Sequence, residues 1–101
     1  MKVAITGGTG FVGSHLVEVF DAHGIDVVAT GRRVEEGMRD GISWRRADLS
    51  DPDSLRRAFE GCDAVVANAA LSPGRAAADD QAFVDANERG SVAQLEAASD
   101  V

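Results

Sequence analysis

The chain has 101 residues, 45% of them hydrophobic, which fits one small folded domain and no more. Its 17 acidic and 10 basic side chains give a net charge of −7, which argues against general binding to nucleic acid or to anionic membranes. A single cysteine, Cys62, excludes an internal disulfide. Because no apolar run has membrane-spanning length and no signal-peptide pattern follows Met1, we expect a cytoplasmic protein.

Four short runs rich in apolar and β-branched residues are expected to form strands, at 2–6, 26–30, 42–47 and 64–68. Helical patterns separate or follow them, and this alternation predicts an α/β fold with a Rossmann-type, doubly wound parallel sheet. Right-handed crossovers then give the strand order 3-2-1-4. The fourth run would lie at a sheet edge although it is apolar, and such edges are normally covered. We therefore expect the first part of a longer protein, or a half-domain that associates with itself.

The helical patterns rest on apolar residues three or four positions apart. For the first helix, over 11–23, the expected buried side consists of Val12, Leu16 and Phe20. The second helix is expected to begin after the cap Asp51. For the last helix, over 79–99, the expected packing face consists of Val84, Ser91, Leu95 and Ala98.

The stretch 6–13, Thr-Gly-Gly-Thr-Gly-Phe-Val-Gly, joins the first expected strand to the first helix with glycines at the spacing G-x-x-G-x-x-G. Gly7 permits a tight turn, Gly10 lets an anion approach the backbone, and Gly13 lets the helix pack closely on the sheet. The N–H groups at the start of the helix attract negative charge. These features predict a site for a dinucleotide pyrophosphate; the alternative is a glycine-rich turn without a ligand. The expected contacts are Gly7, Thr9, Gly10, Phe11, Val12 and Gly13.

Together with later segments, the glycine turn resembles the extended branch of the short-chain dehydrogenase/reductase family, which contains NAD(P)-dependent epimerases, dehydratases and reductases. The later segments are Gly31-Arg32-Arg33, 47–51, Asn68-Ala69-Ala70 and 87–98. The similarity covers nearly all of this chain but only the N-terminal part of a family member. It implies that residues 1–101 are an incomplete dinucleotide-binding domain, without the catalytic and substrate-binding part.

The end of the second expected strand bears on the choice of cofactor, because NAD enzymes tend to place a carboxylate there for the ribose 2′-hydroxyl. In this chain Thr30-Gly31 is followed by Arg32 and Arg33, and guanidinium groups are suited to a 2′-phosphate. NADP is therefore the expected cofactor, with NAD possible. The alternative is a solvated loop with incidental arginines.

The resemblance implies further cofactor contacts. Asp48 would accept a hydrogen bond from the adenine amino group and Leu49 would pack on the ring; alternatively, Asp48 only caps a turn. The backbone at Asn68, Ala69 and Ala70 would pass close to the ribose and pyrophosphate, although the extended branch often has His where Asn68 stands. Asn87 would organise the nicotinamide end, or it is a buried polar residue bonded to a carbonyl.

Family chemistry uses a Tyr-x-x-x-Lys pair, in which the tyrosine moves the proton. This sequence has no tyrosine, and Lys2 is its one lysine, so we expect no catalytic residue in it. No spacing of His, Cys, Asp or Glu residues suggests a metal site. The preferred interpretation is the NADP-binding part of a reductase or epimerase/dehydratase that acts on a nucleotide sugar or small carbonyl compound. The complete protein would be a homodimer with a small-molecule substrate and no nucleic-acid or membrane partner. The rivals are an NADP-sensing regulatory protein of the same fold and the self-associating half-domain.

Overall fold

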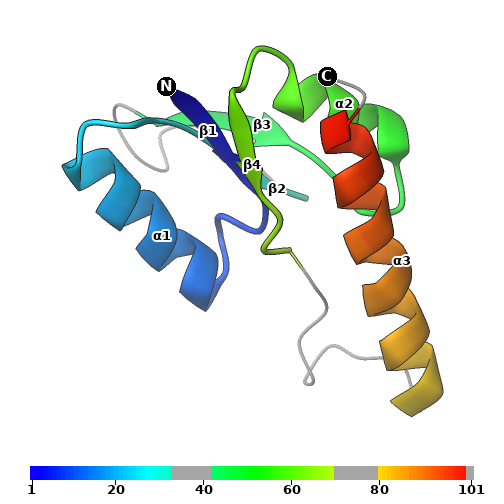
Figure 1. Cartoon of the computed structure of the whole chain (residues 1–101). Coiled ribbons are helices and arrows are strands. Elements are labelled where there is room, and N and C mark those ends of the chain that lie inside the picture. The colour runs from blue at the N-terminus through cyan, green and yellow to red at the C-terminus, as the bar shows by residue number, and fades with distance from the viewer. Residues whose placement is uncertain (33–41, 70–79, 100–101) are drawn as a thin grey trace.

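The structure, a computed structural model, describes residues 1–32, 42–69 and 80–99, and for 80–86 it describes the backbone alone. Figure 1 shows the elements of these segments, whose bounds lie within two residues of the expected ones. In chain order they are β1 (Lys2–Ile5), α1 (Phe11–Ala22), β2 (Asp26–Gly31), β3 (Ser43–Arg46), α2 (Pro52–Phe59), β4 (Ala64–Val66) and α3 (Asp80–Ser99).

The described strands form one parallel sheet in the order β3-β2-β1-β4, which confirms the predicted topology. Near the carboxyl edge Ile5 of β1 lies opposite Ala29 of β2 on one side and Val66 of β4 on the other. Because all pairs are parallel, the segments that follow the strands emerge at the same edge of the sheet. β4 is at the end of this order, as expected for the fourth run.

The sheet separates two apolar clusters, as the period of two along a strand requires. Ile5 points to the face covered by α1, where it packs in a cluster with Val17. Ala4 points to the opposite face, where it belongs to a cluster with Phe59 of α2 and Ala97 of α3. Figure 1 shows α1 on one side of the strands and α2 and α3 on the other. The central strands are therefore buried on both faces, which is typical of doubly wound sheets.

The predicted stripe of α1 holds for Leu16 and Phe20, which pack against the cluster of Ile5 and Val17, but not for Val12. Gly13 and Val17 are buried, Leu16 and Phe20 are half-buried, and Val12 is 56% exposed. Val12 lies in the first turn of α1, beyond the carboxyl edge of the sheet, so the strands do not reach it.

The predicted packing face of α3 is wrong for Ser91 and Leu95, while Ala98 packs against the cluster of Phe59 and Ala97. Ser91 is exposed, Leu95 is 63% exposed and Ala98 is half-buried, while the side chain of Val84 lies outside the described residues. Among residues 87–99, whose side chains the structure describes, the buried positions are Gly90, Gln94 and Ala97. A Cβ at Gly90 would lie 2.8 Å from Leu49 Cδ1, so α3 approaches the segment after β3 too closely for a larger residue. Close approach at Gly90 and apolar packing at Ala97 together mark the side of α3 that faces the protein.

Both ends of α2 are capped by side chains. Asp51 is its N-cap, as predicted, and the carboxylate accepts a hydrogen bond from Ser54 N at 3.3 Å. At the other end Arg45 Nη1 donates to the carbonyl oxygens of Ala58 and Glu60, each at 2.9 Å. Arg45 therefore serves the fold. Within the described segments, no helix combines the length and apolarity needed to cross a membrane.

Candidate cofactor-binding site

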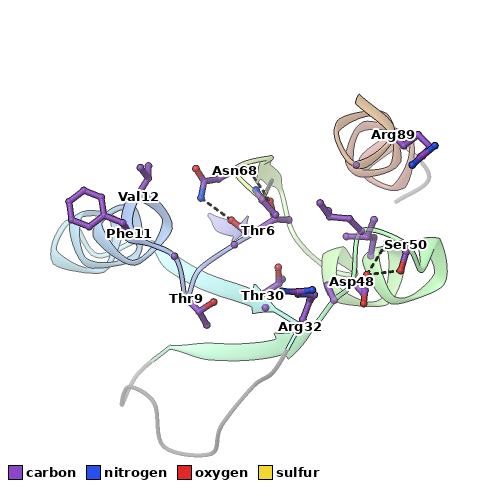
Figure 2. A pocket seen from close by; sticks show the side chains of 18 residues that line it. Thr6, Thr9, Phe11, Val12, Thr30, Arg32, Asp48, Ser50, Asn68 and Arg89 are labelled. Carbon is purple, nitrogen blue, oxygen red and sulfur yellow. Dashed lines mark hydrogen bonds between the residues drawn. The ribbon is translucent and has the colours of Figure 1, made fainter. Parts of the chain in front are cut away.

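A cleft of about 850 Å³ opens at the carboxyl edge of the sheet, a size typical of small-molecule sites. Open α/β sheets bind their ligands at this edge. The segments after all four described strands and one turn of α3 contribute to it, and Figure 2 shows their side chains. The lining residues are Thr6, Gly7, Thr9, Gly10, Phe11, Val12, Thr30, Gly31, Arg32, Ala47, Asp48, Leu49, Ser50, Leu55, Asn68, Ala69, Arg89 and Gly90.

Most of the residues predicted to contact a cofactor lie together in this cleft. They are Gly7, Thr9, Gly10, Phe11, Val12, Arg32, Asp48, Leu49, Asn68 and Ala69. Gly13 and Asn87 do not line it; Gly13 is buried and Asn87 is half-buried on α3. Arg33 and Ala70 lie outside the described residues. The grouping is what a dinucleotide site requires, and the individual contacts remain predictions.

The glycine turn is held against the strands on both sides of β1. Gly7 has a φ of +66°, a left-handed conformation that favours glycine. A Cβ at Gly7 would also lie 3.0 Å from Ala69 Cα, so the segment after β4 touches the turn. On the other side Gly8 N donates to Thr30 O of β2 at 2.8 Å.

Gly10 and Gly13 differ in what surrounds them. A Cβ at Gly10 would meet only Gly7 O, at 3.4 Å, so the described protein leaves this side of the turn open. A Cβ at Gly13 would lie 1.9 Å from Gly7 O and 2.9 Å from Asn68 Nδ2. Gly13 therefore lets α1 pack against the turn itself, whereas we expected it to serve contact with the sheet.

The start of α1 is suited to an anion. Its N-cap is Gly10, which provides no side-chain hydrogen bond, and the first turn contains no acidic residue. The first N–H groups of a helix have no intrahelical partner and carry a partial positive charge. Phe11 and Val12 follow directly, line the cleft and expose their side chains, Phe11 to 93%. The open side of Gly10 and these N–H groups fit a pyrophosphate.

Asp48 is both a turn residue and part of the cleft. Its Oδ1 accepts hydrogen bonds from Ser50 N at 2.9 Å and from Ser50 Oγ at 2.7 Å. These bonds, first from the backbone and then from the hydroxyl, lower the pKa of Asp48; burial opposes the shift, while Arg32 and Arg46 add to it. Asp48 is thus ionised at neutral pH. Asp48 therefore caps a turn, and the predicted contact with adenine remains a prediction.

Two arginines reach the cleft from opposite sides. Arg32 follows β2 and is exposed, and Figure 2 shows it beside Thr30 and Asp48. Arg89 of α3 lines the cleft on the side opposite Phe11 and is also exposed, and in Figure 2 its guanidinium points away from the other labelled side chains. Sequence reasoning missed Arg89, although it is one of the few basic residues in the last part of the chain. In the described part of the chain, no group of three or more His, Cys, Asp or Glu side chains could hold a metal.

Sequence reasoning also missed a buried polar pair behind the cleft, Thr6 and Gln94, each 1% exposed. Thr6 Oγ1 accepts hydrogen bonds from Asn68 N at 2.8 Å and Ala69 N at 2.9 Å, and it donates to Gln94 Oε1. Asn68 Nδ2 returns a bond to Thr6 O at 3.3 Å. The sequence did contain a signal for Gln94: it lies four residues after Gly90, and therefore on the same face of the expected helix as a glycine that permits close packing.

Known proteins share both sequence and fold with this chain. The family model described as "NAD dependent epimerase/dehydratase family" matches residues 3–101. UDP-glucose 4-epimerase of Streptomyces lividans is 38% identical over 109 residues, which cover 95% of this chain and 31% of that protein. Vestitone reductase of Medicago sativa is 40% identical over 73 residues, or 60% of this chain and 22% of that protein.

Among solved structures, UDP-glucose 4-epimerase of Thermus thermophilus in complex with NAD has a TM-score of 0.75 and 30% identity. The match covers 96% of this chain and 33% of that one. The chain thus spans about a third or less of the length of these relatives. With the family model matched over nearly the whole chain and the cleft formed by the glycine turn, the chain belongs to the NAD-dependent epimerase/dehydratase family.

Proposed function

We infer that this chain is the dinucleotide-binding part of a reductase or epimerase/dehydratase, and that it prefers NADP to NAD. The preference rests on one observation: the end of β2 contributes Arg32 to the cleft, while Thr30 and Gly31 contribute no carboxylate for a ribose 2′-hydroxyl. The pyrophosphate would lie at the glycine turn and the start of α1. The adenine end would lie toward Asp48 and Leu49, on the side of the cleft from which Arg32 extends.

Within this proposal the residues of the chain bind and orient the cofactor, and the bound nicotinamide supplies the hydride chemistry. The sequence has no tyrosine, so a tyrosine that moves the proton would belong to another part of the protein. The names of the relatives, an epimerase of a nucleotide sugar and a reductase, support the two proposed substrate classes. These classes are nucleotide sugars and small carbonyl compounds.

Arg32 suits a phosphate for electrostatic reasons. Its guanidinium offers a planar set of N–H donors that match phosphate oxygens in pairs. Its charge already acts on the nearby Asp48 carboxylate, whose pKa it helps to lower. A hydrogen bond to a charged group contributes about 1.5–3 kcal/mol, which corresponds to a change of roughly 10- to 150-fold in affinity.

The test compares binding of NADP and NAD to the unaltered chain and to Arg32→Ala by calorimetric titration. We expect the affinity for NADP to fall by about tenfold or more and the affinity for NAD to stay within twofold. The matched control is Arg57→Ala, which removes an exposed arginine of α2 that does not line the cleft. Equal affinities of the unaltered chain for NADP and NAD would contradict the preference. Binding of neither would contradict the dinucleotide site.

A further inference from the structure

Gln94 is a buried amide that joins three segments behind the cleft. Its Nε2 donates to Ala69 O at 3.0 Å and to Gly90 O at 3.1 Å, and its Oε1 accepts from the Thr6 hydroxyl. The two carbonyl oxygens beside Nε2 fix the orientation of the amide, because a carbonyl oxygen accepts and does not donate. Gln94 therefore connects the end of β1, the segment after β4 and α3. Gln94 itself does not line the cleft.

The bond to Gln94 determines how Thr6 uses its hydroxyl. A hydroxyl has one proton and two lone pairs. When the proton is directed to Gln94 Oε1, both lone pairs of Thr6 can accept, and they do so from Asn68 N and Ala69 N. Another acceptor for the proton is Val66 O at 3.3 Å, a longer contact. Gln94 thereby fixes the backbone at Asn68 and Ala69 twice, through Thr6 and through Ala69 O.

The position of Ala69 in turn limits the glycine turn. A Cβ at Gly7 would lie 3.0 Å from Ala69 Cα and 3.3 Å from Ala69 N, so the two backbones touch. Thr6, which Gln94 also holds, is the residue directly before Gly7. Any movement of the segment after β4 would therefore be transmitted to the turn that is proposed to hold the pyrophosphate.

Packing alone does not explain a glutamine at this position. The other buried residues among 87–99 of α3, Gly90 and Ala97, are small and carry no polar side-chain atom. Burying an amide has a cost in free energy unless its hydrogen bonds are made, and a thioether or aliphatic chain of similar length would avoid that cost. The three hydrogen bonds offset the cost and, at the same time, give the cleft a defined shape.

We propose that Gln94 is a positioning residue for the dinucleotide: it acts through Thr6 and Ala69 and sets the shape of the glycine turn without touching the ligand. The inference rests on the proposed function, because it concerns the same cleft. It extends the site to a residue of α3 that is 88 positions away from Thr6 in sequence.

The test uses Gln94→Met, which keeps the length of the side chain and removes its hydrogen bonds. We expect the affinity for NADP to fall by about tenfold, and the amide protons of Asn68 and Ala69 to exchange faster with solvent. The control is Ala97→Gly, which destabilises α3 by loss of helix propensity at a buried position on the same side of the helix. In this control we expect the affinity to stay within twofold, although the free energy of unfolding falls.

A double-mutant cycle with Thr6→Val adds a second readout. Because Gln94 acts partly through Thr6, the losses of binding free energy in the two single variants should sum to more than the loss in the double variant.

The proposal is overturned if Gln94→Met binds NADP as tightly as the unaltered chain, or if Ala97→Gly loses as much affinity as Gln94→Met. If the unaltered chain binds neither dinucleotide, the proposed function fails instead. If Gln94→Met does not fold, the test is the NMR signal of the Gln94 Nε2 protons in the unaltered chain. Slow exchange of these protons with solvent and a change in their chemical shift on NADP binding would support the proposal. Fast exchange, or a chemical shift that NADP leaves unchanged, would contradict it.

Discussion

Substitution of Gly10 by aspartate should change stability and ligand binding in opposite directions. Gly10 is the N-cap of α1 with φ −80° and ψ 174°, an extended conformation open to any residue, and its Cβ would meet only Gly7 O at 3.4 Å. An N-cap aspartate accepts a hydrogen bond from the first turn and places negative charge at the positive end of the helix. Gly10→Asp should therefore raise the free energy of unfolding by about 0.5–1 kcal/mol.

The same carboxylate would compete with a pyrophosphate for the N–H groups at the start of α1. Two like charges about 5 Å apart repel by roughly 1–3 kcal/mol for effective dielectric constants between 80 and 20, the range that suits an exposed site. Dinucleotide affinity should thus fall by about 5- to 150-fold, and less at high salt. Urea unfolding measures the first effect and calorimetric titration the second.

The control for Gly10→Asp is Ser43→Asp, which adds the same charge at an exposed position at the start of β3, outside the cleft. Its affinity for the dinucleotide should stay within twofold of that of the unaltered chain. If Gly10→Asp is more stable and still binds the dinucleotide unchanged, the start of α1 does not hold the anion, and the reasoning on the glycine turn is refuted.

Three further predictions follow from other contacts. Gly13→Ala places a methyl group 1.9 Å from Gly7 O, and this overlap should lower the free energy of unfolding by about 1–3 kcal/mol or more. Urea titration measures the loss, and an unchanged unfolding midpoint would show that the turn is not so tightly packed. Ser50→Ala removes one of the hydrogen bonds that lower the pKa of Asp48, so the unaltered chain should have the higher free energy of unfolding at neutral pH. This difference should disappear as the pH falls through the lowered pKa of Asp48, and a difference that persists in acid would contradict the reasoning. Ala64→Lys, at the exposed start of the edge strand β4, should reduce self-association of the chain in light scattering, and an unaltered chain that stays monomeric at all concentrations would contradict this.

The fold was predictable because its signals are local. Each strand is marked by a short apolar run, and the glycine spacing after β1 identifies the turn between Ile5 and Phe11. Right-handed crossovers then leave few strand orders, and the observed one is among them. Most of the candidate site followed as well, because residues directly after parallel strands must meet at one edge of the sheet.

The rest depends on how elements approach one another, which local patterns do not contain. Leu95 was expected on the packing face of α3 because of its spacing from Ser91 and Ala98, yet it is exposed. The rotation of α3 brings Gly90 against Leu49, and these two residues are far apart in sequence. The same rotation brings Gln94 behind the cleft and Arg89 into it, so neither role was visible before the helix was placed.

The contacts of the glycine turn have a kinetic consequence. Gly10 N donates to Gly7 O at 3.0 Å, Gly8 N donates to Thr30 O at 2.8 Å, and Gly13 lies against Gly7 O. All of these contacts exist within the protein, so the entropy of ordering the turn is lost during folding rather than when a ligand arrives. A ligand would meet a site that is already shaped. Its association should then be a single bimolecular step whose observed rate rises linearly with ligand concentration, without the plateau that a slow rearrangement produces.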